Sequence, residues 1–155
     1  MFQKILVPLD GSEHSLKALE EAAQIAKISS GKITLMNVYS VRVEPIMTPE
    51  VYESGYIGAP ILTGDQISAI AEVARKSGNR ILEDGEQRIS ATGVQVEKML
   101  VEGHTVQEIV RAANEGNFDL IVIGARGISH IREMLLGSVT DGVIHHAHCA
   151  VLVIK

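Results

Sequence analysis

Two pairs of residues in the last third of the chain have the types and spacing of a phosphate-binding loop. Gly124 and Gly127 follow a short aliphatic run, and Gly137 and Ser138 precede a segment with helical periodicity. Glycine allows close backbone approach or positive φ, and the free N–H groups at a helix N-terminus favour an anion. This stretch is therefore suited to binding a phosphate group.

The side chains around these glycines add hydroxyl groups and positive charge. Ser138 and Thr140 supply hydroxyls, while Arg126 and a protonated His130 supply charge. The run from Ser138 to Asp141 also fits an ordinary helix start, with Ser138 as the N-cap. Both interpretations stay open, because one serine can cap the empty protein and contact phosphate in a complex.

A carboxylate follows the first aliphatic run of the chain, within Pro8-Leu-Asp-Gly-Ser12. Ligands of open parallel sheets bind beyond the carboxyl ends of the strands, so Asp10 is expected near the glycines. Its carboxylate can accept hydrogen bonds from a ribose hydroxyl or an adenine amino group. An ordinary turn aspartate before a helix is the alternative.

The elements that must position these residues alternate along the chain. Short runs rich in Ile, Leu and Val are separated by longer segments of helical period, which indicates βαβ units and a parallel sheet covered on both faces. The third strand alternates polar and apolar residues and is predicted to lie at an edge. We predict five strands, over residues 4–9, 32–38, 95–101, 120–123 and 150–154.

Four segments have helical periodicity. The first begins after Ser12, a predicted N-cap, and ends before Gly31. The second covers about residues 65–91, where Gly78 and Gly85 weaken the helical pattern without removing it. The third and fourth helices are predicted around residues 105–114 and after Ser138.

Residues 40–64 have no regular period and contain several prolines and glycines. Loops of this length in a compact domain are usually functional or mobile. We expect this loop either to cover a site or contact a partner, or to be a flexible surface insertion.

Composition limits the class of protein. The chain has 155 residues, of which 46% are hydrophobic, 21% charged and 3% aromatic, which predicts one globular domain with an aliphatic core. A net charge of −5 without a basic run argues against a nucleic-acid partner. The apolar stretch at residues 1–9 is too short for a signal peptide or a membrane span.

The single cysteine and the histidines have less favoured functional interpretations. Cys149 cannot form an internal disulfide, which favours a reducing cytoplasm, and we expect it to be a small apolar filler instead of a catalytic thiol. His145, His146 and His148 cluster near a helix end, where cations are favoured, and a metal site there is the minor alternative.

The spacing Gly-x2-Gly-x9-Gly-Ser from Gly124 to Ser138 resembles the ATP-binding signature of the universal stress proteins. The resemblance extends over almost the whole chain, including Lys-Ile-Leu-Val-Pro-Leu-Asp-Gly-Ser at the start and Cys-Ala-Val-Leu-Val-Ile at the end. It implies one α/β domain over residues 1–155, with an open, Rossmann-like five-stranded parallel sheet similar to adenine nucleotide alpha hydrolases. It also implies helices on both faces and the strand order 3-2-1-4-5.

The resemblance implies an ATP-binding, cytoplasmic stress sensor or regulator that forms a homodimer through its last strand and has an unidentified protein partner. Family members often have proline where this chain has Ala150, a departure that affects the dimer strand and leaves the nucleotide site intact. We expect Mg²⁺ or Mn²⁺ with the nucleotide, because the loop offers few fixed positive charges against a triphosphate. The implied nucleotide-binding residues are Pro8, Leu9, Asp10, Val38, Gly124, Ala125, Arg126, Gly127, Ser129, His130, Gly137, Ser138, Val139 and Thr140.

Two other functions are compatible with such a fold. One is an adenylyl-transferring or slow ATP-hydrolysing enzyme, whose usual His-x-Gly-His or Ser-Gly-Gly-x-Asp-Ser sequence after the first strand is replaced here by Leu-Asp-Gly-Ser-Glu-His. The other is an interaction module with an empty pocket. Because no residue has an evident general-base partner, we predict no catalytic residues and favour a regulator.

Overall fold

The computed structural model describes residues 1–41, 62–128 and 136–155. Most of the predicted loop at 40–64, together with Ser129 and His130, therefore lies outside the described residues. The elements are β1 (Lys4–Pro8), α1 (Glu13–Ser29), β2 (Lys32–Tyr39), α3 (Gly64–Ile89), a 3-10 turn η1 (Ser90–Thr92), β3 (Gln95–Glu102), α4 (Thr105–Glu115), β4 (Leu120–Gly124), α5 (Ser138–His146) and β5 (Ala150–Ile154).

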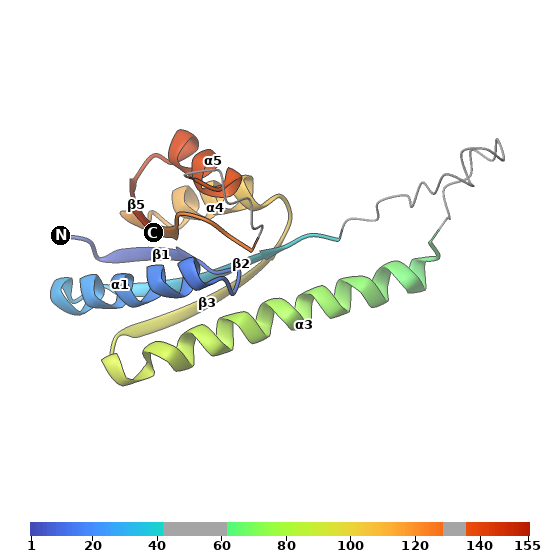
Figure 1. The fold of residues 1–155 in the computed structure, drawn as a ribbon, viewed down its shortest axis with the longest axis horizontal. Helices are drawn as coiled ribbons and strands as arrows, with labels where there is room; N and C mark the ends of the chain where they lie inside the picture. Colours follow the sequence, from blue (N-terminus) through green and yellow to red (C-terminus); the bar gives the residue numbers. More distant parts are fainter. Residues whose placement is uncertain (42–61, 129–135) are drawn as a thin grey trace.

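The five strands form one parallel sheet in the order β3-β2-β1-β4-β5, which confirms the predicted α/β fold and the edge position of β3. Figure 1 shows helices on both faces of this sheet. Lys4 of β1 pairs with Lys32 of β2, and Leu120 of β4 pairs with both Ile5 and Ala150. With the strands parallel and in register, their carboxyl ends meet at one edge.

The core consists of two aliphatic layers, one on each face of the sheet. Alternate residues of a strand point to opposite faces, so neighbours such as Leu35 and Met36 belong to different layers. One layer packs against α1 and α3, and the other against α4 and α5. This arrangement confirms the aliphatic core expected from the scarcity of aromatic residues.

Helix α1 begins after Ser12 and ends before Gly31, as predicted. The Ser12 hydroxyl accepts a hydrogen bond from the N–H of Ser15 at 3.2 Å, which confirms Ser12 as the N-cap. At the other end Ser30 adopts the left-handed conformation with φ of 53°, one residue before the predicted terminal glycine. A Cβ at Gly31 would lie 2.7 Å from the carbonyl oxygen of Phe2, so glycine here allows close approach of the N-terminal segment.

The long helix predicted at 65–91 is confirmed as α3, followed by η1. Its two internal glycines have a packing role that the helical pattern did not indicate. A Cβ at Gly78 would lie 2.5 Å from Asn37 Oδ1, and a Cβ at Gly85 would lie 2.7 Å from Leu9 Cδ1. Glycine lowers the helix propensity at these two positions, but its lack of a side chain permits close packing of α3 against the sheet.

The N-terminal half of α3 extends beyond the sheet in Figure 1. Ile67, Ile70 and Val73 are exposed there, and Thr63 and Gln66 form a reciprocal capping box that stabilises the helix start. Charged residues lie between the apolar residues along this helix. Across residues 1–41, 62–128 and 136–155, no helix has both the length and the apolar character that a membrane span requires.

Candidate functional site

The carboxyl edge of the sheet contains a cavity of about 250 Å³ formed by the ends of β1, β2 and β4 together with α4 and α5. Of the predicted site residues, Ala125, Gly137 and Ser138 do not line it, and Ser129 and His130 lie outside the described residues. The predicted residues that do line it are Pro8, Leu9, Asp10, Val38, Gly124, Arg126, Gly127, Val139 and Thr140.

Sequence reasoning missed part of the lining. Met36 lies two positions before Val38 on the same face of β2, so strand alternation could have identified it. Thr105 and Ile109 enter from the first turns of α4, which starts just beyond the carboxyl end of β3. The full set of missed residues is Ser15, Met36, Thr105, Ile109, Ile123 and Ile128.

Asp10 connects two loops at this edge. Its Oδ1 accepts a hydrogen bond from the N–H of Ser12 at 2.9 Å, as an ordinary turn aspartate does. Its Oδ2 accepts a hydrogen bond from the N–H of Ile128 at 3.2 Å, which attaches the first loop to the glycine loop. A carboxylate offers about four acceptor positions, so Asp10 keeps capacity for donors of a ligand.

The loop glycines provide close approach without unusual backbone conformation. A Cβ at Gly127 would lie 2.5 Å from Asp10 Oδ2, and a Cβ at Gly124 would lie 2.7 Å from the backbone carbon of His14. Of the two reasons given for glycine here, close approach applies to Gly124 and Gly127, whereas positive φ occurs at Gly11, with a value of 82°. Gly124 and Gly127 are required by packing between the loop and the first part of the chain.

The start of α5 differs from its predicted capping. The N-cap is Gly137, without a side-chain hydrogen bond, and Ser138 is the exposed first helical residue. The interpretation of Ser138 as the N-cap is therefore wrong, because the helix starts one residue earlier than the capping pattern suggests. The N–H of Asp141 bonds to the carbonyl of Gly137, so the N–H groups of Ser138 and Val139 belong to the free first turn.

Hydrogen bonds fix the glycine loop between α5 and β5. The N–H of Gly137 donates to the carbonyl of Ala125 at 2.7 Å, and the N–H of Ala125 donates to the carbonyl of Ile154 at 2.6 Å. The buried hydroxyl of Thr140 donates to the carbonyl of Gly124 at 2.7 Å. Ala125 and Thr140 therefore hold the loop in place through these bonds.

Arg126 brings positive charge to the cavity. Its Nε is buried and has no hydrogen-bond partner within the part of the chain that the structure describes. A buried N–H without an acceptor is costly, by about 1–3 kcal/mol. Together with the free first turn of α5, this guanidinium provides donors suited to an anionic group, so the residues present fit a phosphate.

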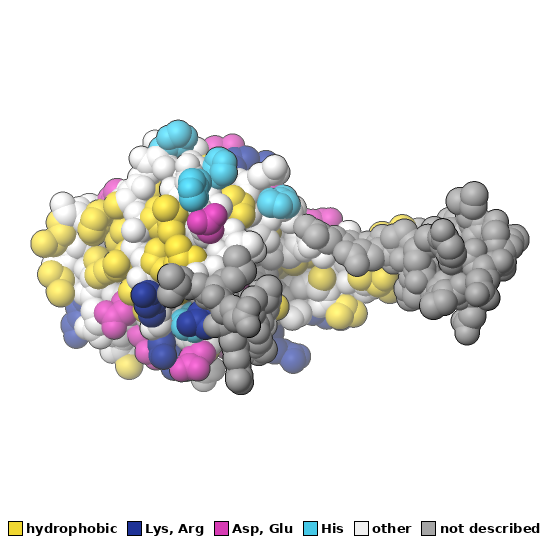
Figure 2. Space-filling model, turned by 45° about the horizontal axis from the view of Figure 1, so that its top comes forward, with side chains coloured by type: hydrophobic (Ala, Val, Ile, Leu, Met, Phe, Trp, Pro, Cys, Tyr) yellow, Lys and Arg dark blue, Asp and Glu magenta, His cyan; other side chains and the backbone are white. Residues whose placement is uncertain are grey.

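The three histidines near the end of α5 lie at the protein surface. Histidine side chains gather at the surface in Figure 2, and His145, His146 and His148 are exposed. Nδ1 of His145 lies 2.8 Å from the carbonyl oxygen of Asp141, one turn earlier in the helix. Within residues 1–41, 62–128 and 136–155 no three His, Cys, Asp or Glu side chains are placed to hold a metal, so the structure adds no support to that alternative.

Cys149 packs against the core layer next to α4 and α5, as expected for a small apolar filler. Burial raises the pKa of its thiol. The neutral thiol is a poor nucleophile, so this environment does not favour covalent chemistry.

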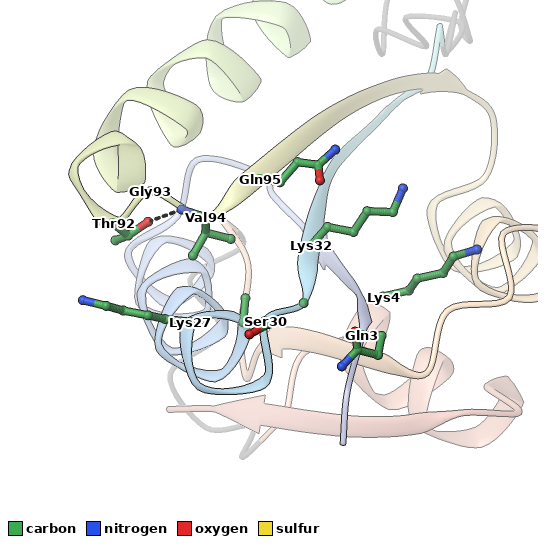
Figure 3. Close-up of a pocket in the computed structure, with 11 residues that line it drawn as sticks. Gln3, Lys4, Lys27, Ser30, Lys32, Thr92, Gly93, Val94 and Gln95 are labelled. Atoms are coloured by element: carbon green, nitrogen blue, oxygen red, sulfur yellow. Dashed lines mark hydrogen bonds between the residues drawn. The ribbon is translucent and has the colours of Figure 1, made fainter.

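A second cavity, of about 530 Å³, lies at the opposite, amino edge of the sheet and contains none of the predicted residues (Figure 3). Three lysines line it. Lys4 donates to the carbonyl of Gly116 at 3.0 Å, and Lys32 pairs with Glu97 at 2.9 Å. Lys27 lies in the last turn of α1, where positive charge stabilises the helix C-terminus. The lysines therefore have structural roles at this edge.

Comparison with known proteins decides the family. The sequence model of the universal stress protein family matches residues 1–155. The chain belongs to this family. Its members include universal stress protein YxiE of Bacillus subtilis, which is 35% identical over 155 residues, with all of both chains covered.

Solved structures of universal stress proteins share the fold. UspA from Lactobacillus plantarum superimposes with a TM-score of 0.79 at 24% identity, covering 99% of this chain and 98% of that one. A universal stress protein solved in complex with cAMP has a TM-score of 0.68 at 30% identity, covering 99% of this chain and 97% of that one.

Proposed function

We propose that this universal stress protein binds ATP, or a close adenine-nucleotide relative, in the cavity at the carboxyl edge of the sheet. In this proposal it acts in the cytoplasm as a nucleotide-dependent sensor or regulator of stress. The observation that supports the proposal most is the composition of one cavity, which combines an apolar wall, a carboxylate and the free first turn of α5.

Each part of the cavity matches one part of a nucleotide. The apolar side chains of Met36, Val38 and Ile109 suit the flat faces of an adenine ring. The Asp10 carboxylate suits the hydroxyl groups of a ribose, because a carboxylate only accepts hydrogen bonds. The start of α5 and Arg126 suit the phosphates.

The relative solved with cAMP supports the ligand class, because cAMP combines adenine, ribose and phosphate. The volume of about 250 Å³ is below the usual range for ligand cavities, roughly 300–1,000 Å³, and suits the nucleoside part. The phosphates are then proposed to lie at its mouth, beside Gly127 and Ser138.

The ligand class is tested by denaturing the purified full-length protein with heat and identifying the nucleotide that it releases. We expect an adenine nucleotide, either directly or after the protein has been incubated with ATP and desalted. Recovery of a different class of ligand, or of none after incubation, would reject the proposal in favour of an interaction module with an empty pocket.

A divalent cation, Mg²⁺ or Mn²⁺, is proposed to accompany the nucleotide and to be held mainly by phosphates and water. Among the described residues, the cavity lining contains one arginine to offset a triphosphate, and Mg²⁺ is commonly bound in this way. Calorimetric titration with ATP in EDTA instead of Mg²⁺ should show an affinity at least about tenfold lower. Equal affinities in the two buffers would exclude the cation.

The chain is also proposed to form a homodimer through β5, an apolar edge strand paired on one side with β4. The carbonyl of Ile154 accepts a hydrogen bond from the N–H of Ala125, so the backbone groups of Ile154 face β4. Neighbouring residues of a strand direct these groups to opposite sides, so the N–H of Val153 faces the open edge.

Replacing Val153 with proline removes this outward N–H and should convert dimers to monomers in sedimentation, whereas Val153→Ala should remain dimeric. A folded Val153→Pro protein that sediments as the same dimer would show that β5 is not the interface.

A further inference from the structure

Asn37 is a buried polar side chain in an otherwise apolar layer of the core. It is 6% exposed and lies on β2 between Met36 and Val38, whose side chains line the cavity on the opposite face of the sheet. Burying an amide costs free energy unless it is hydrogen-bonded. Its Nδ2 donates to the carbonyl of Leu9 at 2.8 Å, so the amide is retained for a contact with the loop after β1.

Leu9 is held at its backbone and at its side chain. Its N–H donates to the carbonyl of Met36 at 2.8 Å, which continues the β1–β2 ladder past the end of β1. Its carbonyl accepts the bond from Asn37. Its side chain occupies the space left by Gly85, where a Cβ would lie 2.7 Å from Cδ1. The residue directly before Asp10 is therefore fixed by β2 and α3 together.

Helix α3 provides the surface that makes these contacts possible. Gly78 and Gly85 are about two helical turns apart on one face of α3. Gly78 leaves room for the Asn37 amide, since a Cβ there would lie 2.5 Å from Oδ1. Between them, Ile81 faces Gly11, because its Cγ1 would lie 3.6 Å from a Cβ built on that glycine. This face of α3 lies behind the whole turn from Leu9 to Gly11.

We propose that Asn37 is a positioning residue that fixes the Leu9 carbonyl, and through it the Asp10 carboxylate, with Gly78 as the position that admits its amide. The inference rests on the proposed function, because Asp10 is the group that orients the nucleoside there. Asn37 acts on the nucleoside part of the site, and the phosphate donors of Arg126 and α5 belong to other elements.

Calorimetric titrations with ATP and with inorganic tripolyphosphate separate the two parts of the site. Asn37→Ala should lower ATP affinity by about tenfold and tripolyphosphate affinity by a smaller factor, because the bond from the Ile128 N–H to Asp10 also links Asn37 to the glycine loop. Gly78→Ala should have the same effect, because the added methyl group displaces the Asn37 amide. The matched control is Gly64→Ala in the same helix, where a Cβ would meet none of the described residues within 4 Å.

The double variant tests whether the two residues act together. In Asn37→Ala the clash with the amide is gone, and the methyl group added by Gly78→Ala meets only the flexible end of Leu100, whose Cδ1 would lie 2.6 Å away, so it should cause little further loss of ATP affinity. Hydrogen exchange of the Leu9 and Ser12 N–H groups should accelerate in Asn37→Ala without any ligand present. This measurement stays informative if the parent protein proves not to bind ATP, an outcome that would reject the proposed function alone.

Unchanged exchange at Leu9 and Ser12 in Asn37→Ala would overturn the positioning role. So would equal losses of ATP and tripolyphosphate affinity in a folded variant, because a general structural role lowers both. Additive losses in the double variant would separate Gly78 from Asn37 and overturn the assignment of Gly78.

Discussion

Replacing Gly127 with valine is expected to lower ATP affinity by about a hundredfold or more, equivalent to about 2.8 kcal/mol. A Cβ at this position would lie 2.5 Å from Asp10 Oδ2, so the side chain must push away the carboxylate that holds the loop. The bond from the Ile128 N–H to Asp10 would then be lost, and the two branches of valine would fill the space that phosphate needs. Calorimetric titration of the variant measures the loss.

Gly64→Val is the matched control for this substitution, because none of the residues that the structure describes lies within 4 Å of a Cβ at Gly64. Its ATP affinity should equal that of the parent protein. The Gly127→Val protein should still fold, since the substituted position is half-buried in a loop. If a folded Gly127→Val protein bound ATP as tightly as the parent, the glycine loop would not be the phosphate site.

Gly124→Val should instead damage folding. A Cβ at Gly124 would lie 2.7–2.8 Å from the backbone carbon, Cβ and carbonyl oxygen of His14, and helix backbone cannot move away as a flexible side chain can. Overpacking of this kind costs about 3 kcal/mol or more, because α1 must separate from β4. In a domain of this size the melting temperature should fall by roughly 6–12 °C, as measured by circular dichroism.

Gly137→Ala is the control for the second experiment. A Cβ there would be at least 3.4 Å from its nearest neighbours, and φ is −72°, so alanine fits. The expected loss is about 1 kcal/mol or less, from the poorer N-cap. A Gly124→Val protein that melted at the temperature of the Gly137→Ala control would show that contact between α1 and β4 is not tight.

The sheet could be predicted well because its signals are local. Four strands are near-continuous aliphatic runs, and all five observed strands agree with the predicted ranges within about one residue. The α1 N-cap was also readable, because Ser12 bonds to a residue three positions later. The order of the strands came from the family resemblance, since periodicity alone does not fix it.

The packing roles of the glycines could not be predicted because they depend on residues distant in the sequence. Gly78 and Gly85 break a helical pattern locally, yet they meet Asn37 and Leu9 from other elements. The same limitation applies to Gly127, whose neighbour is Asp10. Local pattern also placed the α5 cap one residue late, because the glycine before Ser138 takes the capping backbone conformation without a side chain.

The cavity was predicted in outline because the carboxyl ends of parallel strands meet at one edge. Pro8, Asp10 and Gly127 could thus be grouped before the structure was known, and all three line it. Thr105 and Ile109 were missed because the inward face of a short helix such as α4 depends on how it packs over the strand ends.

Calorimetric titration of the nucleotide-free, full-length protein with ATP in Mg²⁺ buffer tests the central claim most directly. The account predicts saturable binding with one ATP per chain, because the proposed site is the single cavity described at the carboxyl edge of the sheet. It also predicts weaker binding of tripolyphosphate, which reaches only the loop and α5, and of adenosine, which reaches only the apolar wall and Asp10. Absence of saturable ATP binding by the folded protein would contradict the account.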